Sequence, residues 1–296
     1  MNPILFGSLV ILTTFLMGSS FTVGKIGLAY VSPLLLVGLR FTIAGMIMAL
    51  FVMKKPLPRK TLDWARVILV GFFQTAGVMG CIFLSLRTIT AGESSILTFS
   101  NPLMVVILST LFLGGKYEVL QWLGVILGFA GVFITLGFHL QLQEGTLLGL
   151  GAAISWATAT VLIKAWGQRF NVWVLTAYQM LFGGILLLIM GVTMETPKLV
   201  FHPTSIFIIL WLAIMASIVQ FAVWFYLLNQ SDPGKTSAFL FLAPFFGVLT
   251  GWMLLDEVVD WYVYIGGGLI ILGIFFVNWS FKPKDMPSSQ NGYQGT

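Results

Sequence analysis

Ten long apolar stretches occupy almost the whole of this chain, and they constrain its fold more than any motif does. They cover residues 4–24, 33–53, 65–86, 92–113, 118–138, 146–166, 171–193, 206–228, 236–255 and 261–281. A helix needs roughly 20 residues to cross a bilayer core that is about 30 Å thick. Each stretch is long enough for one crossing, and the connections are too short for a separate domain outside the membrane. We therefore predict an all-α membrane protein with ten transmembrane helices.

The composition excludes a water-soluble domain. Hydrophobic residues make up 58% of the chain, charged residues make up 8%, and the mean hydropathy is +0.99; this balance is typical of membrane proteins. Met1-Asn2-Pro3 places no positive charge before the first stretch, so we expect that stretch to be retained as a helix. Residues 282–296 are rich in Pro, Ser, Gln and Gly. We predict that they form a disordered cytoplasmic tail.

The ten stretches fall into two copies of five, which we place at residues 1–140 and 145–281. The residues that match at an offset of 139 and then of 142 include Lys25 with Lys164, Arg40 with Gln179, Gly92 with Gly234, Pro102 with Pro244, Gly124 with Gly266 and Gly131 with Gly273. Glycines and prolines in the same order are hard to produce by chance, even in an apolar chain. A second copy with an odd number of spans enters the bilayer from the opposite face. We therefore expect two inverted five-helix repeats around a central cavity, as in secondary transporters.

The distribution of lysine and arginine predicts the orientation, because cytoplasmic loops retain an excess of both. With the amino terminus inside, eleven basic residues fall in cytoplasmic segments and three, Lys25, Arg87 and Lys198, fall in outer segments. We therefore predict a multi-pass protein of the plasma membrane with both termini in the cytoplasm. The net charge of +5 reflects this topology and does not indicate a nucleic-acid partner.

Arg40 is the sharpest single residue, because a guanidinium inside the bilayer is costly unless it meets water, a partner or the bundle interior. In one interpretation it binds a carboxylate or another anionic group of a substrate in the cavity, where its planar fork suits such groups. In the other it ties helices together through carbonyls or polar side chains. The sequence leaves both interpretations open.

Other polar and aromatic residues within the spans are further candidates for the substrate site. Amides inside a span usually face the bundle, where they hydrogen-bond across helices or contact a ligand. The candidates that join Arg40 are Met17, Gln74, Asn101, Trp156, Gln179, Gln220, Trp224 and Tyr226. Gln179 duplicates Arg40, and Gln220, Phe221 and Trp224 are spaced for one helix face. Pro102 and Pro244 fall within the fourth and ninth spans and are candidate hinges or static kinks.

Several paired segments resemble the drug/metabolite transporter superfamily, in its EamA-like branch of ten helices. They are Phe15-Leu16-Met17-Gly18-Ser19-Ser20-Phe21 with Lys25, Trp156-Ala157-Thr158-Ala159-Thr160 with Lys164, Arg40, Asn101-Pro102, Ala243-Pro244 and Leu254-Leu255-Asp256-Glu257. The resemblance covers essentially the whole chain. It implies a secondary transporter that exports amino acids or similar small metabolites by alternating access.

Two departures from this family pattern distinguish the copies. The first copy has Leu113-Gly114-Gly115-Lys116 where the family usually has a glutamate, and Met17 stands where tryptophan is expected. These departures indicate that the halves do not contribute equivalent groups.

The sequence gives no support to an enzyme, a cofactor or a metal site. Gly234-Lys235-Thr236 resembles the end of a phosphate-binding loop, but Asn229 stands where the leading glycine is required. The two histidines lack the spacing of a metal site. The expected partners are therefore a small-molecule substrate and the lipid bilayer, with the oligomeric state left open.

Three alternatives and the mode of energy coupling stay open. Exchange of phosphorylated or nucleotide sugars would need several basic groups around the cavity, and only Arg40 lies deep in a span. A membrane enzyme would need a catalytic pair, and a sensor or scaffold would normally carry a soluble output domain. No carboxylate falls in the middle of a span. Uniport, exchange, or coupling through Glu93 or Glu257 are all compatible with that pattern.

Overall fold

The computed structural model describes residues 2–114, 117–135, 143–166, 169–230 and 239–278, and these residues form a helical bundle. In the described ranges, extended pairing is confined to one isolated bridge between Val31 and Leu199. The tail predicted at 282–296 lies outside the described residues. The helices are α1 (Pro3–Gly27), α2 (Pro33–Val52), α3 (Thr61–Gly71), η1 (Phe72–Gly77), α4 (Val78–Ser85), α5 (Ala91–Thr98), α6 (Asn101–Leu113), α7 (Val119–Thr135), α8 (Glu144–Trp166), α9 (Val172–Thr193), α10 (Pro203–Ala213), η3 (Ile214–Val219), α11 (Gln220–Gln230), η4 (Phe239–Phe241), α13 (Leu242–Leu255) and α14 (Trp261–Asn278).

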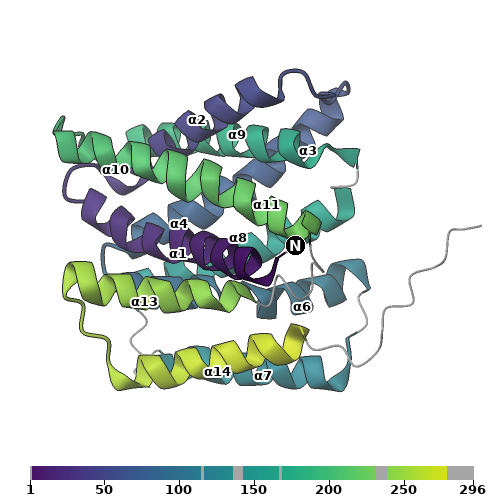
Figure 1. Cartoon of the computed structure of the whole chain (residues 1–296), viewed down its shortest axis with the longest axis vertical. Coiled ribbons are helices and arrows are strands. Elements are labelled where there is room, and N and C mark those ends of the chain that lie inside the picture. The colour runs from purple at the N-terminus through teal and green to yellow at the C-terminus, as the bar shows by residue number, and fades with distance from the viewer. Residues whose placement is uncertain (1, 115–116, 136–142, 167–168, 231–238, 279–296) are drawn as a thin grey trace, which may run out of the picture.

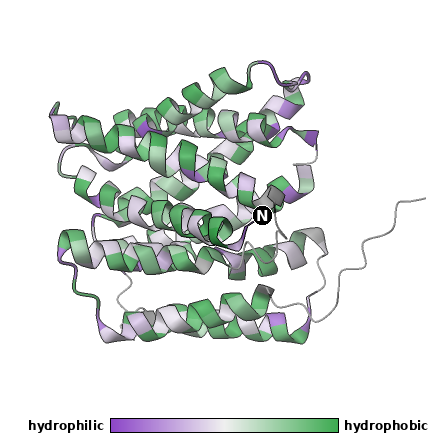
Figure 2. Cartoon of the chain, viewed as in Figure 1, coloured by the Kyte–Doolittle hydropathy of each residue, from purple (hydrophilic) through white to green (hydrophobic). Residues whose placement is uncertain are grey.

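These helices account for the ten predicted spans. Within the described residues, seven helical segments are long and apolar enough to cross a membrane, and three shorter apolar helices, 119–134, 242–255 and 261–277, supply the others. Figure 1 shows the helices stacked in layers, with α2 and α9 at one end of the long axis and α7 and α14 at the other. In Figure 2 hydrophobic residues cover most of each helix, and hydrophilic residues gather near the helix ends.

Irregular backbone recurs at matched positions in the two copies. A π-helical turn interrupts the third span at 72–77 (η1) and the eighth at 214–219 (η3), an offset of 142. The helices of the fourth and ninth spans end next to Gly114 (φ 62°) and Asp256 (φ 50°), again 142 residues apart. Few residues adopt a positive φ, so this agreement shows that the duplication extends to the backbone.

The two prolines lie just after a break in each span, and not in the middle of a helix as the sequence suggested. Pro102 is the second residue of α6, after an interruption at Phe99 and Ser100. Pro244 is the third residue of α13, after the short η4 helix. The first turn of a helix has no internal partner for its amides, so proline costs little there.

The contacts between matched helices show that the copies are inverted. A Cβ atom at Gly273 in α14 would lie 2.5 Å from the carbonyl oxygen of Gly124 in α7. One at Gly131 in α7 would lie 2.6 Å from the carbonyl oxygen of Gly266 in α14. At the offset of 142, Gly131 matches Gly273 and Gly124 matches Gly266, so the repeat converts each of these contacts into the other. From the first contact to the second, residue numbers rise along α7 and fall along α14. The helices are therefore antiparallel around a two-fold axis perpendicular to them, which is an axis in the membrane plane.

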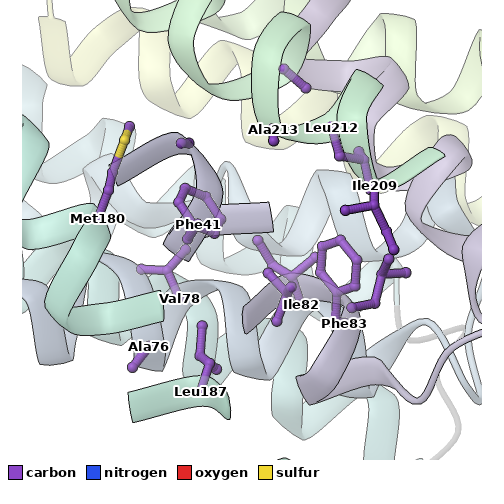
Figure 3. Close-up of a cluster of buried hydrophobic side chains, with 14 of the residues drawn as sticks. Phe41, Ala76, Val78, Ile82, Phe83, Met180, Leu187, Ile209, Leu212 and Ala213 are labelled. Atoms are coloured by element: carbon purple, nitrogen blue, oxygen red, sulfur yellow. The ribbon is translucent and has the colours of Figure 1, made fainter. Parts of the chain in front are cut away.

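The pair formed by α2 and α9 obeys the same symmetry. Gly184 packs against Thr42, and Gly45 packs against Leu181, so the contacts again exchange at an offset of 139. The largest buried apolar cluster lies between these helices and their neighbours α4 and α10, with Phe41, Phe83 and Leu212 among its members (Figure 3). Many other large apolar side chains stay exposed, including Phe207 at 66%. Such a surface suits a chain whose surroundings are lipid.

Candidate functional site

Arg40 lies on α2 and is 2% exposed. Its Nε donates to the hydroxyl of Ser217 at 2.9 Å, and its Nη2 donates to the carbonyl of Ala216 at 2.8 Å. Its guanidinium also lies 4.7 Å from the centre of the Phe41 ring. Both hydrogen-bond acceptors belong to η3, so the guanidinium is held by the π-helical turn of the eighth span.

The π-helical turn explains why a backbone carbonyl is available to Arg40. In an α-helix the amide of Gln220 would bond to the carbonyl of Ala216, but here it bonds to that of Met215. The carbonyl of Ala216 is thus left to accept from Arg40. Ser217 in turn donates to the carbonyl of Leu212 at 3.0 Å, which fixes its hydroxyl for the bond from Nε. Turns of this kind occur often at functional sites.

A cavity of about 50 Å³ lies beside Arg40 at the centre of the bundle. Its lining includes four pairs that the repeat relates by 139 or 142 residues, namely Met17 with Trp156, Gln74 with Ala216, Val78 with Gln220, and Met79 with Phe221. Residues exchanged by a two-fold axis surround one space only if that space lies on the axis. The cavity therefore occupies the central position expected from the inverted repeat.

Three buried polar atoms on the lining residues have no hydrogen-bond partner among the described residues. They are Nη1 of Arg40, Nε2 of Gln220 and Oγ1 of Thr98. A buried polar group without a partner costs about 1–3 kcal/mol, and more when it is charged. The nitrogens of Arg40 and Gln220 are donors, so the site is built to meet an acceptor such as a carboxylate.

Aromatic side chains also line the cavity. The ring of Phe21 lies 6.2 Å from that of Phe99, and the ring of Phe99 lies 5.4 Å from that of Trp156. Phe83 and Phe221 also line the space. The lining therefore combines a guanidinium and amide groups with aromatic rings, which suits a molecule that has an anionic group and an apolar body.

The structure brings together five of the nine residues proposed from the sequence. Arg40, Gln74, Gln220, Trp156 and Met17 all line the cavity. Sequence reasoning missed Phe21, Phe99, Thr98 and Ser217. Phe21 stands within the segment that resembles the family, and Ser217 matches another hydroxyl residue, Thr75, at an offset of 142. Those two signals were present in the sequence.

The remaining four candidates are not among the cavity-lining residues. Gln179 is 5% exposed in α9, and its backbone packs against Gly71. Its side chain is shorter than that of Arg40, so it does not extend as far towards the axis. Asn101 is buried at the start of α6. Trp224 is half-buried and Tyr226 is 45% exposed, both further along α11 than Gln220. In the described part of the chain, no group of three or more metal-binding side chains is close enough to hold an ion.

Comparison with known proteins agrees with this architecture. A model of the EamA-like transporter family matches residues 5–137 and again residues 143–279. The uncharacterized transporter YoaV of Bacillus subtilis is 26% identical over 283 residues, a match that covers 93% of this chain and 97% of that protein. A protein of Escherichia coli named a probable amino-acid metabolite efflux pump is 27% identical over 282 residues, covering 91% and 93%.

One solved crystal structure resembles the fold with a TM-score of 0.65 at 20% identity, covering 91% of this chain and 96% of that chain. The family and the named relatives are transporters and not enzymes. Because the family model matches nearly the whole chain in two copies, this protein belongs to the EamA-like transporter family.

Proposed function

We propose that the protein exports amino acids or similar small carboxylates across the plasma membrane by alternating access. The observation that carries the proposal is the buried guanidinium of Arg40, which keeps Nη1 unpaired beside the unpaired Nε2 of Gln220 in a cavity on the two-fold axis. A relative named a probable amino-acid metabolite efflux pump supports the same class of substrate. The distribution of basic residues supports cytoplasmic termini.

In this mechanism each part of the cavity has a separate task. Ser217 and the carbonyl of Ala216 hold the guanidinium in place, so Nη1 and the amide of Gln220 donate to the substrate carboxylate. Charge-assisted bonds of this kind are stronger than neutral ones. Phe99 and Trp156 contact the apolar part of the substrate. The cavity contains Arg40 as the one cationic residue of its lining, which fits a single carboxylate better than a phosphorylated or nucleotide sugar.

The size of the cavity implies movement. Sites for small molecules usually have volumes of about 300–1,000 Å³, so a cavity of about 50 Å³ is too small for an amino acid. The helices around the axis must separate before substrate enters. The inverted repeat provides two equivalent ways to do this, one towards each side of the membrane.

Binding to the purified protein tests this proposal. We would measure the shift in melting temperature caused by a panel of amino acids and by the matching amines that lack the carboxylate. Arg40→Met should remove the shift. Arg40→Lys should weaken binding roughly tenfold to a hundredfold, because the charge-assisted hydrogen bond from Nη1, worth about 1.5–3 kcal/mol, loses its geometry. Gln179→Ala is the matched control, because Gln179 occupies the position that duplicates Arg40 but does not line the cavity.

Efflux from cells that carry each variant provides the second measurement. Loss of efflux in Arg40→Met, with normal expression and with efflux retained in Gln179→Ala, is the expected result. Normal efflux in both Arg40→Lys and Arg40→Met would show that Arg40 has only a structural role. Equal shifts from amino acids and their amines would exclude recognition through a carboxylate.

A further inference from the structure

Lys25 and Glu257 form a partly buried ion pair at the end of the bundle where α1 ends. The Nζ of Lys25 lies 2.7 Å from Oε1 of Glu257, and it also donates to the carbonyl of Ile89 at 2.9 Å. The side chain of Glu257 is 7% exposed and that of Lys25 is 28% exposed. This pair lies outside the cavity described above, and the proposed substrate contacts do not use it.

Glu257 also binds the start of α5. Its two carboxylate oxygens accept from the amide of Ala91, the first residue of α5, at 3.1 and 2.9 Å. The first amides of a helix have no internal partner and carry a partial positive charge, so a carboxylate is favoured there. Glu257, which lies between α13 and α14, thus joins the end of α1 to the start of α5.

The carboxylate of Glu257 also packs against the end of the helix that precedes it. A Cβ atom at Gly251 in α13 would lie 2.5 Å from Oε2 of Glu257, so the carboxylate is packed directly against α13. The helices α1 and α13 also pack along each other, and α5 packs on both. If the central cavity opens towards this end, α1 or α13 has to move away from α5. That movement breaks the bonds that Glu257 makes to Lys25 and Ala91.

The inverted twin of this pair is incomplete in the sequence. Lys25 is matched by Lys164 at an offset of 139, but Glu257 is matched by Gly115 and Ala91 by Pro233 at an offset of 142. Glycine has no side chain and proline has no amide hydrogen. The second copy therefore repeats the lysine without the carboxylate and without the amide that the carboxylate binds. At the matched sequence positions, the contacts of Lys25 and Glu257 therefore have no counterpart of the same chemistry.

Building on the proposed alternating-access function, we propose that Lys25 and Glu257 favour the state in which the cavity is closed at their end of the bundle. We call this interaction, which is made at one end of the bundle, the clasp. In a carrier whose halves were identical, the two facing states would have equal free energy, because the two-fold axis exchanges them. A bond present at one end alone removes that equality. In the predicted orientation this end faces outward. The clasp then keeps the cavity turned towards the cytoplasm, where an exporter collects its substrate.

Thiol labelling without substrate tests the clasp. Cys81→Ala first removes the free cysteine. Ser20→Cys is then added, which places one thiol on the lining of the cavity. A membrane-impermeant maleimide is added from the side on which α1 ends. Glu257→Leu removes both the ion pair and the bond to Ala91, and Glu257→Gln keeps an acceptor for Ala91. We expect labelling to rise roughly a hundredfold in Glu257→Leu, which loses two charge-assisted bonds, and roughly tenfold in Glu257→Gln, which loses one, because each lost bond shifts the open-to-closed ratio by about a factor of ten.

Glu93→Gln is the matched control. Glu93 also lies at the start of α5, but its carboxylate bonds only to the amide and hydroxyl of Thr90 in the same segment. Its loss should leave labelling at the unmodified rate. The exchanged pair Lys25→Glu with Glu257→Lys restores the opposite charges, but a lysine at 257 cannot accept from Ala91. We expect labelling in this variant to stay raised.

Unchanged labelling in Glu257→Gln and in Lys25→Gln, with both variants eluting as the unmodified protein does, would overturn the clasp. These two conservative variants decide the question if Glu257→Leu does not fold. The assay uses no substrate, so its outcome is independent of the substrate class. Amino acids and their matching amines could shift the melting temperature equally while labelling rises as expected in the Glu257 variants. That result would overturn the proposed substrate and leave the clasp intact.

Discussion

Replacing a single glycine at the contact between α7 and α14 tests the inverted repeat quantitatively. In Gly273→Ala the new methyl group would lie 2.5 Å from the carbonyl oxygen of Gly124, whereas ordinary contact begins at 3.4 Å. The obstacle is backbone, so the two helices must separate by roughly 1 Å. Overpacking of this kind costs about 1–3 kcal/mol. Gly131→Ala meets the equivalent carbonyl of Gly266 at 2.6 Å, so we expect it to cost the same amount.

Gly268→Ala serves as the control, because a Cβ atom at Gly268 would have no neighbour within 4 Å. It lies on α14 as Gly273 does, so the gain of about 0.5–1 kcal/mol from replacing glycine within a helix is common to both variants. The difference between Gly273→Ala and Gly268→Ala isolates the packing cost, expected at about 1–3 kcal/mol. Thermal unfolding in detergent, followed by tryptophan fluorescence, measures it. Equal stability of Gly273→Ala and Gly268→Ala would refute the close contact. Unequal losses in Gly273→Ala and Gly131→Ala would refute the symmetry.

Two further substitutions test the irregular backbone. Pro102→Ala should change the free energy of unfolding by less than about 1 kcal/mol, because Pro102 lies in the first turn of α6 and interrupts no helical hydrogen bond. A gain of about 3 kcal/mol would show that the proline interrupts the interior of a helix. Ser217→Ala should cost about 1–3 kcal/mol, since it leaves Nε of the buried Arg40 without its acceptor. Ser155→Ala is the control, because it loses a neutral hydrogen bond to the carbonyl of Phe73. It should cost less than Ser217→Ala in the same unfolding assay. An equal cost would argue that the bond from Arg40 to Ser217 is no stronger than a neutral one.

The spans and their pairing were predictable from the sequence because both depend on patterns that repeat. Long apolar stretches predict helices in a bilayer regardless of tertiary detail, and the structure confirms ten of them in two halves. Matched residues such as Met17 with Trp156 also predicted which side chains would share the central cavity. The position of the repeat axis follows from the sequence once the offset between the copies is known.

The hydrogen-bonded partners of Arg40 were not predictable, because they depend on a π-helical turn. Such a turn inserts one extra residue into the helix, and nothing in 214–219 distinguishes it from an ordinary apolar helix. Reasoning from a period of 3.6 residues placed Trp224 with Gln220, but only Gln220 and Phe221 line the cavity. Gln179 shows a second limit, because matched backbone positions do not give side chains of different length the same reach.

Under the proposed alternating-access mechanism, the positions at which the two copies differ determine any preference for one facing state over the other. A contact that is repeated in both halves stabilises the inward-facing and outward-facing states equally, because the two-fold axis turns one state into the other. Such contacts, including those between Gly131 and Gly266, contribute to stability and to the path of the movement but not to its bias. A difference in free energy between the two states can come only from unmatched positions. Glu257 opposite Gly115 is one such position, and Arg40 opposite Gln179 is another. Substitutions that remove a contact made at one end of the bundle alone should therefore change the balance between facing states. Matched substitutions made in both halves at once should leave that balance unchanged even when they lower stability.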